Sequence, residues 1–479
     1  MLSRIGARVT SLPFAVITAA YLGVRLLAFG DRSPTYFQDS YSYLEVAKLN
    51  PLSADFLAGP RPFTTPLFFK LLGSDEPRIY VQLALSIVCW IALAATVALL
   101  LKNARLRPWA YAAILALSLG AWIVQWDSAL LSESLSLSLM AAVTAAWLWF
   151  VERPSWPRVA SILLVSLLWA FTRDTNAFVV AFTLPLLAIA LWRSRRKRLI
   201  AVAFVGSIAI FAANLVSAEA GSTDDQRAAV LSGKPGGGFA RSPELRALPT
   251  QQYLLVLHGR WEYPLLNIMG MRILPDHERV KYFQYHGMPV TPRLLQATGE
   301  RGGGQNGVFF KAPELAGFRR WEEEKGQRTY LRYLVTHPGY VVSSMASGAG
   351  LVLFPREDIA ELGIWSKPPD PVGAALPGPV NRLFFSHSVA SGIVWALLLA
   401  LALFLALTRV PRRIWLVPAA MIVITVPHML VVWHGDALEP ERHGVPVAIL
   451  ARLGVLLLIL FGLDANARSR LRAPLARSG

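Results

Sequence analysis

The stretch IYVQLALSIVCWIALAATVALLL, residues 79–101, contains no charged residue. A run of this length matches the roughly 20 apolar residues that an α-helix needs to cross the hydrocarbon core of a bilayer. Similar apolar segments lie on both sides of it, at 11–30, 108–125, 129–151, 158–172, 176–192, 199–217, 388–407, 414–433 and 445–463. We therefore expect an all-α polytopic membrane protein with about ten transmembrane helices.

The composition of the whole chain agrees with this fold class. Of its 479 residues, 54% are hydrophobic and only 16% are charged, whereas about a quarter of the residues in a soluble domain are charged. These values exclude a soluble enzyme, a disordered protein and a coiled coil. The one cysteine, Cys89, lies within the 79–101 run, so neither a disulfide framework nor a cysteine-based metal site is expected.

Basic residues outnumber acidic ones, with 47 Lys and Arg against 30 Asp and Glu and a net charge of +17. They gather in short clusters between apolar segments, such as residues 193–198. Clusters of this kind face the cytoplasm in polytopic membrane proteins, and they also meet anionic lipids. The short loops on the opposite side, near 126, 173 and 438, contain only Arg173 and Arg442 among the basic residues. This asymmetry predicts cytoplasmic termini and contact with membrane lipids, not with nucleic acid.

The pattern divides the chain into three parts. Residues 1–217 form an N-terminal membrane module of about seven helices, 218–387 an extracytoplasmic loop domain, and 388–479 a C-terminal module of about three helices with a basic tail. The outer loop 31–78 of the first module suits a short interfacial helix with Leu44 and Ala47 on one face, and a second short helix at 67–72. Glycine-rich stretches at 235–238 and 302–304 and a helix pattern at 319–335 predict helices and long loops in the second part.

The predicted outer turns share one property, because each of them carries charge. The residues are Asp39 in the first loop, Asp127 and Glu133 around the second turn, Arg173 and Asp174 in the third, and His434, Asp436, Glu439, Arg442 and His443 in the last. A charge costs roughly 2.5–3.5 kcal/mol at the centre of a span and less near its ends. Their placement near the outer ends of the spans predicts a shared polar cavity at the outer interface.

Most of these residues also have a purely structural interpretation. Asp39 and Asp127 are of a type favoured as N-caps of the helices that follow them. Arg173 and Asp174 suit a local ion pair at a turn. Arg25, near the outer end of the first segment, can extend to the lipid headgroups. The position of Glu133 favours a functional role, because this residue lies about one turn inside an apolar segment.

The last outer turn indicates a bound anion. Glu439-Pro440 is typical of a helix start, which places Arg442 and His443 in the first turn, where the helix dipole disfavours positive charge. A phosphate would supply the missing partner. One alternative is a salt bridge from Arg442 to a nearby acid, namely Asp436, Glu439 or Glu441. Another is a divalent metal held by His434, Asp436 and Glu439, although this spacing matches no metal-ligand signature.

Together these features resemble the integral-membrane glycosyltransferases of the GT-C superfamily, in particular bacterial relatives of the protein mannosyltransferase and aminoarabinose transferase group. The resemblance rests on Asp39 in the first outer loop, the interfacial helix and the Pro-rich stretch 59–66 after it. It also includes Trp126-Asp127 with Leu131-Ser132-Glu133-Ser134, and the Asp-x-x-Glu-x-x-Arg-His pattern at 436–443. The family often has two adjacent acids in the first loop, whereas this chain reads Gln38-Asp39-Ser40.

The resemblance implies transfer of a sugar from a polyprenyl phosphate donor to a hydroxyl of a lipid, glycan or protein, at the outer face of a bacterial inner membrane. Asp39 would be the general base of an inverting reaction. The donor phosphate would be bound by Arg173, Arg442 and His443, with Arg61 as a further candidate. Residues that would position the sugar or support these arginines are Asp127, Glu133, Asp174, His434, Asp436 and Glu439. Apart from the divalent metal considered above, no cofactor is implied.

Three other functions are alternatives to sugar transfer. A transporter or flippase for lipid-linked glycans would also bind a phosphate, but it would need polar residues deep in several spans. A ligase that moves a whole glycan shares the chemistry and differs in the size of its donor. A non-catalytic scaffold would leave the acids of four separate turns unexplained.

Overall fold

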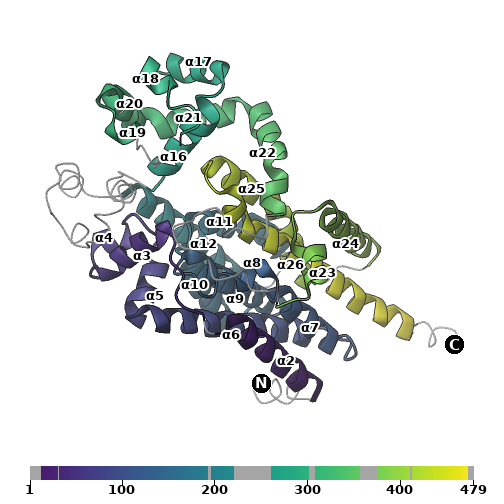
Figure 1. Cartoon of the computed structure of the whole chain (residues 1–479). Helices are drawn as coiled ribbons and strands as arrows, with labels where there is room; N and C mark the ends of the chain where they lie inside the picture. The colour runs from purple at the N-terminus through teal and green to yellow at the C-terminus, as the bar shows by residue number, and fades with distance from the viewer. Residues whose placement is uncertain are drawn as a thin grey trace.

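The computed structural model describes residues 12–30, 32–191, 196–220, 260–300, 308–355, 375–409 and 413–472. Within these ranges the regular structure is helical, without a strand, and one isolated β-bridge joins Thr35 to Ala129. Figure 1 shows long helices side by side in a bundle and a group of short helices, α16–α21, apart from it. The glycine-rich stretches 235–238 and 302–304 and the end of the basic tail lie outside the described residues.

The helices of the first half follow the predicted segments. They are α2 (Leu12–Phe29), α3 (Gln38–Lys48), α4 (Ala54–Leu57), α5 (Thr64–Leu72), α6 (Asp75–Leu100), α7 (Arg107–Ser118), α8 (Ala121–Val124), α9 (Ser132–Glu152), α10 (Trp156–Ala170), α11 (Asp174–Leu191) and α12 (Lys197–Ala220). Short helices are thus present at both places where the loop 31–78 was expected to form them, as α3 and α5, and their position at the membrane interface stays a prediction. Ala47 of α3 is buried and Leu44 is half-buried, so the predicted apolar face packs within the protein.

The second half contains two groups of helices. The first group is α16 (Glu262–Ile268), the π-helix η2 (Met269–Ile273), α17 (His277–Tyr285), α18 (Pro292–Leu295), α19 (Val308–Lys311), η3 (Pro313–Leu315), α20 (Ala316–Trp321), the π-helix η4 (Glu322–Gly326), α21 (Gln327–Thr336) and α22 (Pro338–Leu353). The second is α23 (Gly378–Phe385), α24 (Val389–Thr408), η6 (Arg413–Trp415), α25 (Leu416–Gly435) and α26 (Pro440–Arg472). The predicted helix at 319–335 is therefore formed in three consecutive pieces, α20, η4 and α21.

Seven helices in the described ranges are long and apolar enough to cross a membrane, namely α2, α6, α9, α12, α24, α25 and α26. The length and composition of these helices thus indicate a multi-pass helical membrane protein. The arrangement of ten spans stays a prediction. One expected continuous span, 108–125, is wrong, because the chain breaks at Gly120 between α7 and α8. A Cβ atom at Gly120 would lie 2.6 Å from the Phe385 ring, so this close packing requires glycine.

Burial separates central helices from peripheral ones. In α9 and α26, 89% of the most apolar window is buried inside the protein, whereas in α24 only 17% is buried. A helix that is apolar all round and buried on every side occupies the centre of a bundle, and one that exposes leucine and phenylalanine faces lipid. The two central helices, α9 and α26, each carry charged residues at their N-terminal ends, and these ends meet at the site described below.

The group α16–α21 has its own hydrophobic core, which includes Phe283, Phe309, Phe318 and Trp321. It is joined to the bundle by α22, whose Val352 packs with Met429, Val432 and Val447 of α25 and α26. Sequence analysis did not anticipate an apolar helix here, within 218–387. The physical reason for its docking is a close helix–helix approach, since a Cβ atom at Gly348 would lie 2.1 Å from the Trp433 ring.

Arg452 is a buried charge inside α26 to which sequence analysis assigned no role. Its guanidinium donates to the carbonyl oxygens of Leu353 at 2.8 Å and Phe384 at 3.3 Å, near the C-terminal ends of α22 and α23. It also lies 4.6 Å from the centroid of the Trp122 ring. A cation at helix C-termini compensates the dipole of those helices. Arg452 therefore attaches α22 and α23 to the bundle.

Candidate functional site

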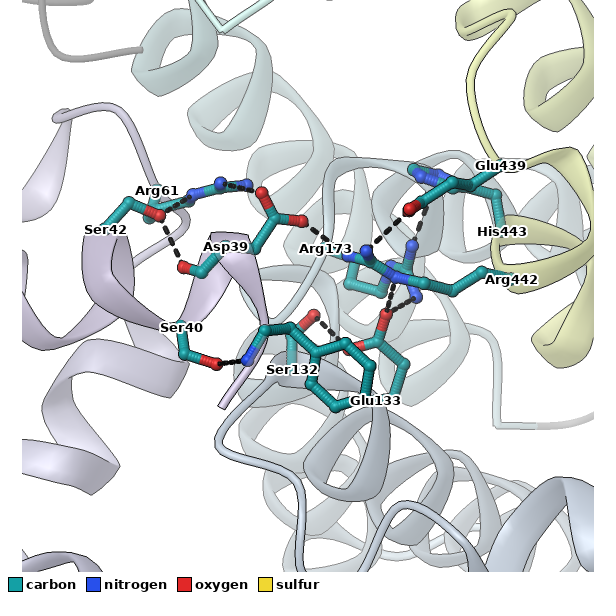
Figure 2. Close-up of polar contacts among 11 residues, drawn as sticks. Asp39, Ser40, Ser42, Arg61, Ser132, Glu133, Arg173, Glu439, Arg442 and His443 are labelled. Carbon is teal, nitrogen blue, oxygen red and sulfur yellow. Dashed lines mark hydrogen bonds and ion pairs between the residues drawn. The ribbon is translucent and has the colours of Figure 1, made fainter. Parts of the chain in front are cut away.

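Asp39 lies in the first turn of α3, but it does not cap the helix. Phe37 occupies the N-cap position, and the Phe37 backbone N–H donates to Ser40 Oγ at 2.8 Å. The Asp39 carboxylate accepts instead from Arg61 Nη2 at 2.7 Å and from Arg442 Nη2 at 2.6 Å. Figure 2 shows it between these two arginines. The N-cap interpretation of Asp39 is therefore wrong, because α3 begins at Gln38, one residue before Asp39.

Arg442 binds three carboxylates at once. Its Nη2 contacts Asp39, its Nη1 contacts Glu439 and its Nε contacts Glu133, each at 2.6 Å. The α26 helix begins at Pro440, as predicted, so Arg442 lies in the first turn. The salt bridge to Glu439 was one of the expected alternatives, but the other two partners come from α3 and α9. A guanidinium presents its donors in a fixed planar fork, which suits several acceptors better than an ammonium does.

Glu133 forms the buried floor of this site. Its side chain is 1% exposed, and its Oε1 accepts from Arg442 Nε and, at 3.1 Å, from Arg173 Nη1. Arg173 Nη2 lies 3.2 Å from His443 Nδ1. Because Arg is always a donor, that Nδ1 must accept, which assigns the proton of a neutral His443 to Nε2. Glu133 thus holds Arg442 of α26 and Arg173, which directly precedes α11, and its functional role stays a prediction.

Arg61 forms the rim of the site. Its Nε donates to Ser42 Oγ at 2.7 Å, and its guanidinium lies 4.8 Å from the centroid of the Tyr43 ring. The side chains of Arg61 and Asp39 are 19% and 25% exposed, against 8% for Arg173. The network of Asp39, Arg61, Glu133, Arg173, Glu439 and Arg442, called the ion network below, therefore has an accessible rim and a dry floor.

The ion network is balanced in charge, with three arginines against three carboxylates. Burial alone would raise the pKa of the Asp39 carboxyl, but Arg61 and Arg442 together hold that pKa well below its usual range. Asp39 in turn raises the pKa of Arg61 against the opposing effect of burial. Asp39 is ionised at neutral pH, and in this arrangement it is a weak base.

Asp127 lies outside the ion network. Its side chain is 1% exposed, and its Oδ2 accepts from Arg25 Nη2 at 2.6 Å. Arg25 is fully buried and also donates to Ser86 Oγ and to the Ser118 carbonyl. Burial raises the pKa of Asp127 to about 6. The N-cap interpretation of Asp127 and the headgroup interpretation of Arg25 are both wrong, because the two residues form a buried pair that links α2 to the start of α9.

Asp174 pairs with Arg260 and not with Arg173, so the predicted local ion pair is wrong. Arg260 Nη2 and Nε donate to the two Asp174 carboxylate oxygens at 2.9 and 3.0 Å, and Arg260 Nη1 donates to the Gly59 carbonyl at 3.1 Å. These partners are 86 and 201 residues away in the chain. Arg260 thereby joins the N-terminus of α11, beside Arg173, to the loop that carries Arg61. No local sequence signal indicated this residue.

Asp436 and His434 contact the α16–α22 group instead of the ion network. Asp436 Oδ1 accepts from Asn267 Nδ2 and from the Leu438 backbone N–H, both at 2.9 Å, and burial raises the pKa of Asp436 to about 7. His434 Nε2 lies 3.1 Å from the Val341 carbonyl oxygen. The metal alternative for His434, Asp436 and Glu439 is not supported, since within the described ranges no group of three His, Cys, Asp or Glu side chains could hold a metal ion.

No protein-family model matches this chain, and no curated protein matches its sequence. The site combines a carboxylate at an accessible rim with three guanidinium groups, at the end of a bundle of apolar helices. Guanidinium groups bind phosphate with charge-assisted hydrogen bonds, and a carboxylate can accept a proton from a hydroxyl.

Proposed function

We propose that this protein is a membrane glycosyltransferase of the GT-C type. It moves a sugar from a polyprenyl phosphate donor to a hydroxyl of a lipid, glycan or protein acceptor, on the extracytoplasmic side of a bacterial inner membrane. The observation that carries the proposal is the convergence of Asp39, Arg61, Arg173 and Arg442. These four residues come from four separate segments and meet at one end of an apolar bundle.

In the proposed reaction Asp39 takes the proton of the acceptor hydroxyl while the hydroxyl oxygen attacks the anomeric carbon. The bond from that carbon to the donor phosphate oxygen breaks, and its electron pair stays on the polyprenyl phosphate. The attack comes from the face opposite the phosphate, so the configuration inverts. General base catalysis of this kind contributes about 10²–10⁴-fold in rate.

The shared arginines account for the charge changes in this reaction. As Asp39 becomes neutral by taking a proton, the departing phosphate gains one negative charge. Arg442 and Arg61 already contact Asp39 at 2.6 and 2.7 Å, so a phosphate bound beside Asp39 would lie within their reach. The negative charge can therefore shift from carboxylate to phosphate while both guanidinium groups stay in place. Fixed positive groups that stabilise the negative charge developing in the transition state are a main source of enzymatic rate enhancement.

The other acids of the network support this arrangement. Glu133 and Glu439 hold Arg442 from two sides, and Glu133 also holds Arg173. A guanidinium fixed by buried carboxylates does not have to reorganise when the substrate binds. Asp127, Asp174, His434 and Asp436, which were also expected at the site, act in this proposal through the packing of the helices around it.

The test is a transfer assay with the full chain in lipid nanodiscs, supplied with the lipid extract of a bacterial membrane. Release of polyprenyl phosphate and gain of a sugar by an acceptor are followed by mass spectrometry. Wild type should release polyprenyl phosphate, and Asp39→Asn should not. Asp55→Asn, in the same loop but outside the ion network, should behave like wild type. Absence of any sugar transfer by the folded wild-type protein, with lipid extracts from several bacteria, would exclude the proposed function.

A further inference from the structure

We propose that Asp39 occupies the place of the donor phosphate between Arg61 and Arg442, and that the donor exchanges with it on these two arginines. This inference rests on the proposed function and concerns the regulation of the same site. Both oxygens of Asp39 are bound to arginine. Each oxygen accepts one hydrogen bond, and the two guanidinium groups stabilise the charged carboxylate. Asp39 therefore becomes a stronger base when it leaves at least one of them.

Each of the two arginines has a second anchor that does not involve Asp39. Arg61 is held by Ser42 Oγ and by the face of the Tyr43 ring. Arg442 is held by Glu133 and Glu439, through donors other than the one that contacts Asp39. When the Asp39 side chain moves away, both guanidinium groups therefore keep their positions, and the Nη2 group of each, which had bound Asp39, is released. Two donors arranged in this way suit the oxygens of a phosphate.

Asp39 is the carboxylate of the network that is best placed to leave. Its side chain is 25% exposed, whereas the side chains of Glu133 and Glu439 are 1% and 14% exposed. Glu133 is bound by two arginines at the dry floor. Glu439 is three residues from Arg442 in the chain, so this contact is local. Asp39 is on α3, whereas Arg442 is on α26 and Arg61 is in the loop between α4 and α5, and an anion that arrives at the rim meets Asp39 first.

The exchange makes the base strong only when the donor is present. The two arginines that keep Asp39 weakly basic would then be engaged by the phosphate. The released carboxylate would remain beside the sugar, where an acceptor hydroxyl arrives. The donor therefore binds before the acceptor in a productive order, and an acceptor that arrives first meets an inactive base.

The test compares binding of polyprenyl monophosphate and of uncharged polyprenol to the protein in nanodiscs. In this proposal Asp39 competes with the phosphate for the two arginines. The apparent affinity for the phosphate is therefore reduced in proportion to the fraction of protein molecules in which Asp39 has left them. Asp39→Asn and Asp39→Ala should therefore bind polyprenyl monophosphate about tenfold more tightly than wild type. Binding of polyprenol should stay the same, and Asp55→Asn should match wild type with both lipids. Equal or weaker binding of the phosphate by folded Asp39 variants would overturn the exchange.

A measurement on the wild-type protein covers the case in which the Asp39 variants do not fold. Binding of a polyprenyl phosphodiester, which does not titrate near neutral pH, is measured by calorimetry. The measurement is repeated in buffers of different ionisation enthalpy, because the difference in heat reports the number of protons taken up. Release of Asp39 from its arginines should cause uptake of part of a proton at about pH 5 and none at about pH 8. No proton uptake at either pH would overturn the exchange. If the exchange is observed but no sugar is transferred, the proposed function fails and the anion site stands. If sugar is transferred without the exchange, the proposed function stands and the exchange fails.

Discussion

Arg442 and Glu133 are 309 residues apart in the chain, and Arg442 Nε lies 2.6 Å from Glu133 Oε1. This contact joins the N-terminal ends of α26 and α9, the two helices that are most completely buried in the bundle. Both groups are almost fully removed from solvent, with side chains 9% and 1% exposed. This ion pair and the one between Arg442 and Asp39 therefore join the two membrane modules predicted from the sequence, and the proposed active site is built around them.

Removal of the Glu133 charge should destabilise the fold as well as the site. Glu133→Gln leaves Arg173 and Arg442 with fewer compensating charges in a dry environment, and breaking a buried pair from one side costs about 3–5 kcal/mol. The measurement is unfolding of the purified protein in detergent. Glu278→Gln, whose side chain is 80% exposed, provides the control and should not change the stability. A Glu133→Gln variant as stable as wild type would mean that other groups compensate the two arginines.

Substitution of Arg442 by lysine should separate charge from geometry. Lysine keeps the positive charge but cannot present three donors in a plane to three carboxylates. We expect Arg442→Lys to lower the rate of sugar transfer by about 10²–10³-fold, in the range found when one group that stabilises developing negative charge is removed. Transfer kinetics in nanodiscs measure this, with the exposed Arg293→Lys as the matched control. Full activity of Arg442→Lys would show that a point charge suffices.

Arg260 should act as a positioning residue through its contacts with Asp174 and Gly59. Arg260→Lys loses the paired hydrogen bonds to Asp174 and loosens the loop that carries Arg61, so the KM for the donor should rise several-fold. Kinetics at varied donor concentration and thermal unfolding are measured on the same preparation. A purely structural role would lower the thermal midpoint with KM unchanged. Arg332→Lys, on the exposed face of α21, should alter neither quantity.

Stability should depend on pH through Asp436, which is outside the ion network. Its pKa is raised by burial to about 7 in the folded protein, against about 3.9 in an unfolded chain. Between these values the folded state binds more protons than the unfolded state, so the contribution of Asp436 to stability falls as pH rises from about 4 to about 7. Asp436→Asn should therefore gain stability relative to wild type as pH rises through this range. The difference between the two thermal midpoints, measured at several pH values, isolates Asp436 from Asp127, whose raised pKa is common to both proteins. A difference that does not vary with pH would contradict the assignment.

Sequence analysis predicted the helices better than it predicted the partners of charged residues. The start of α26 at Pro440 and the presence of α3 and α5 follow from local rules on proline, apolar spacing and helix ends. The local interpretations of Asp39, Asp127 and Arg173–Asp174 were wrong. In each case the partner comes from another segment of the chain. Asp39 pairs with Arg61 and Arg442, Asp127 with Arg25, and Asp174 with Arg260. Local patterns cannot show such partners, because they depend on how helices pack.

By itself the sequence determined that this is a helical membrane protein, because apolar runs of spanning length have few alternatives in water or lipid. It also determined which segments carry charge near the ends of those helices. Only the tertiary structure decided which charges meet. Buried charges must find partners of opposite sign, and the fold brings Arg442 of α26 within hydrogen-bond distance of Glu133 on α9 and of Asp39 on α3, whereas Asp127 pairs with Arg25.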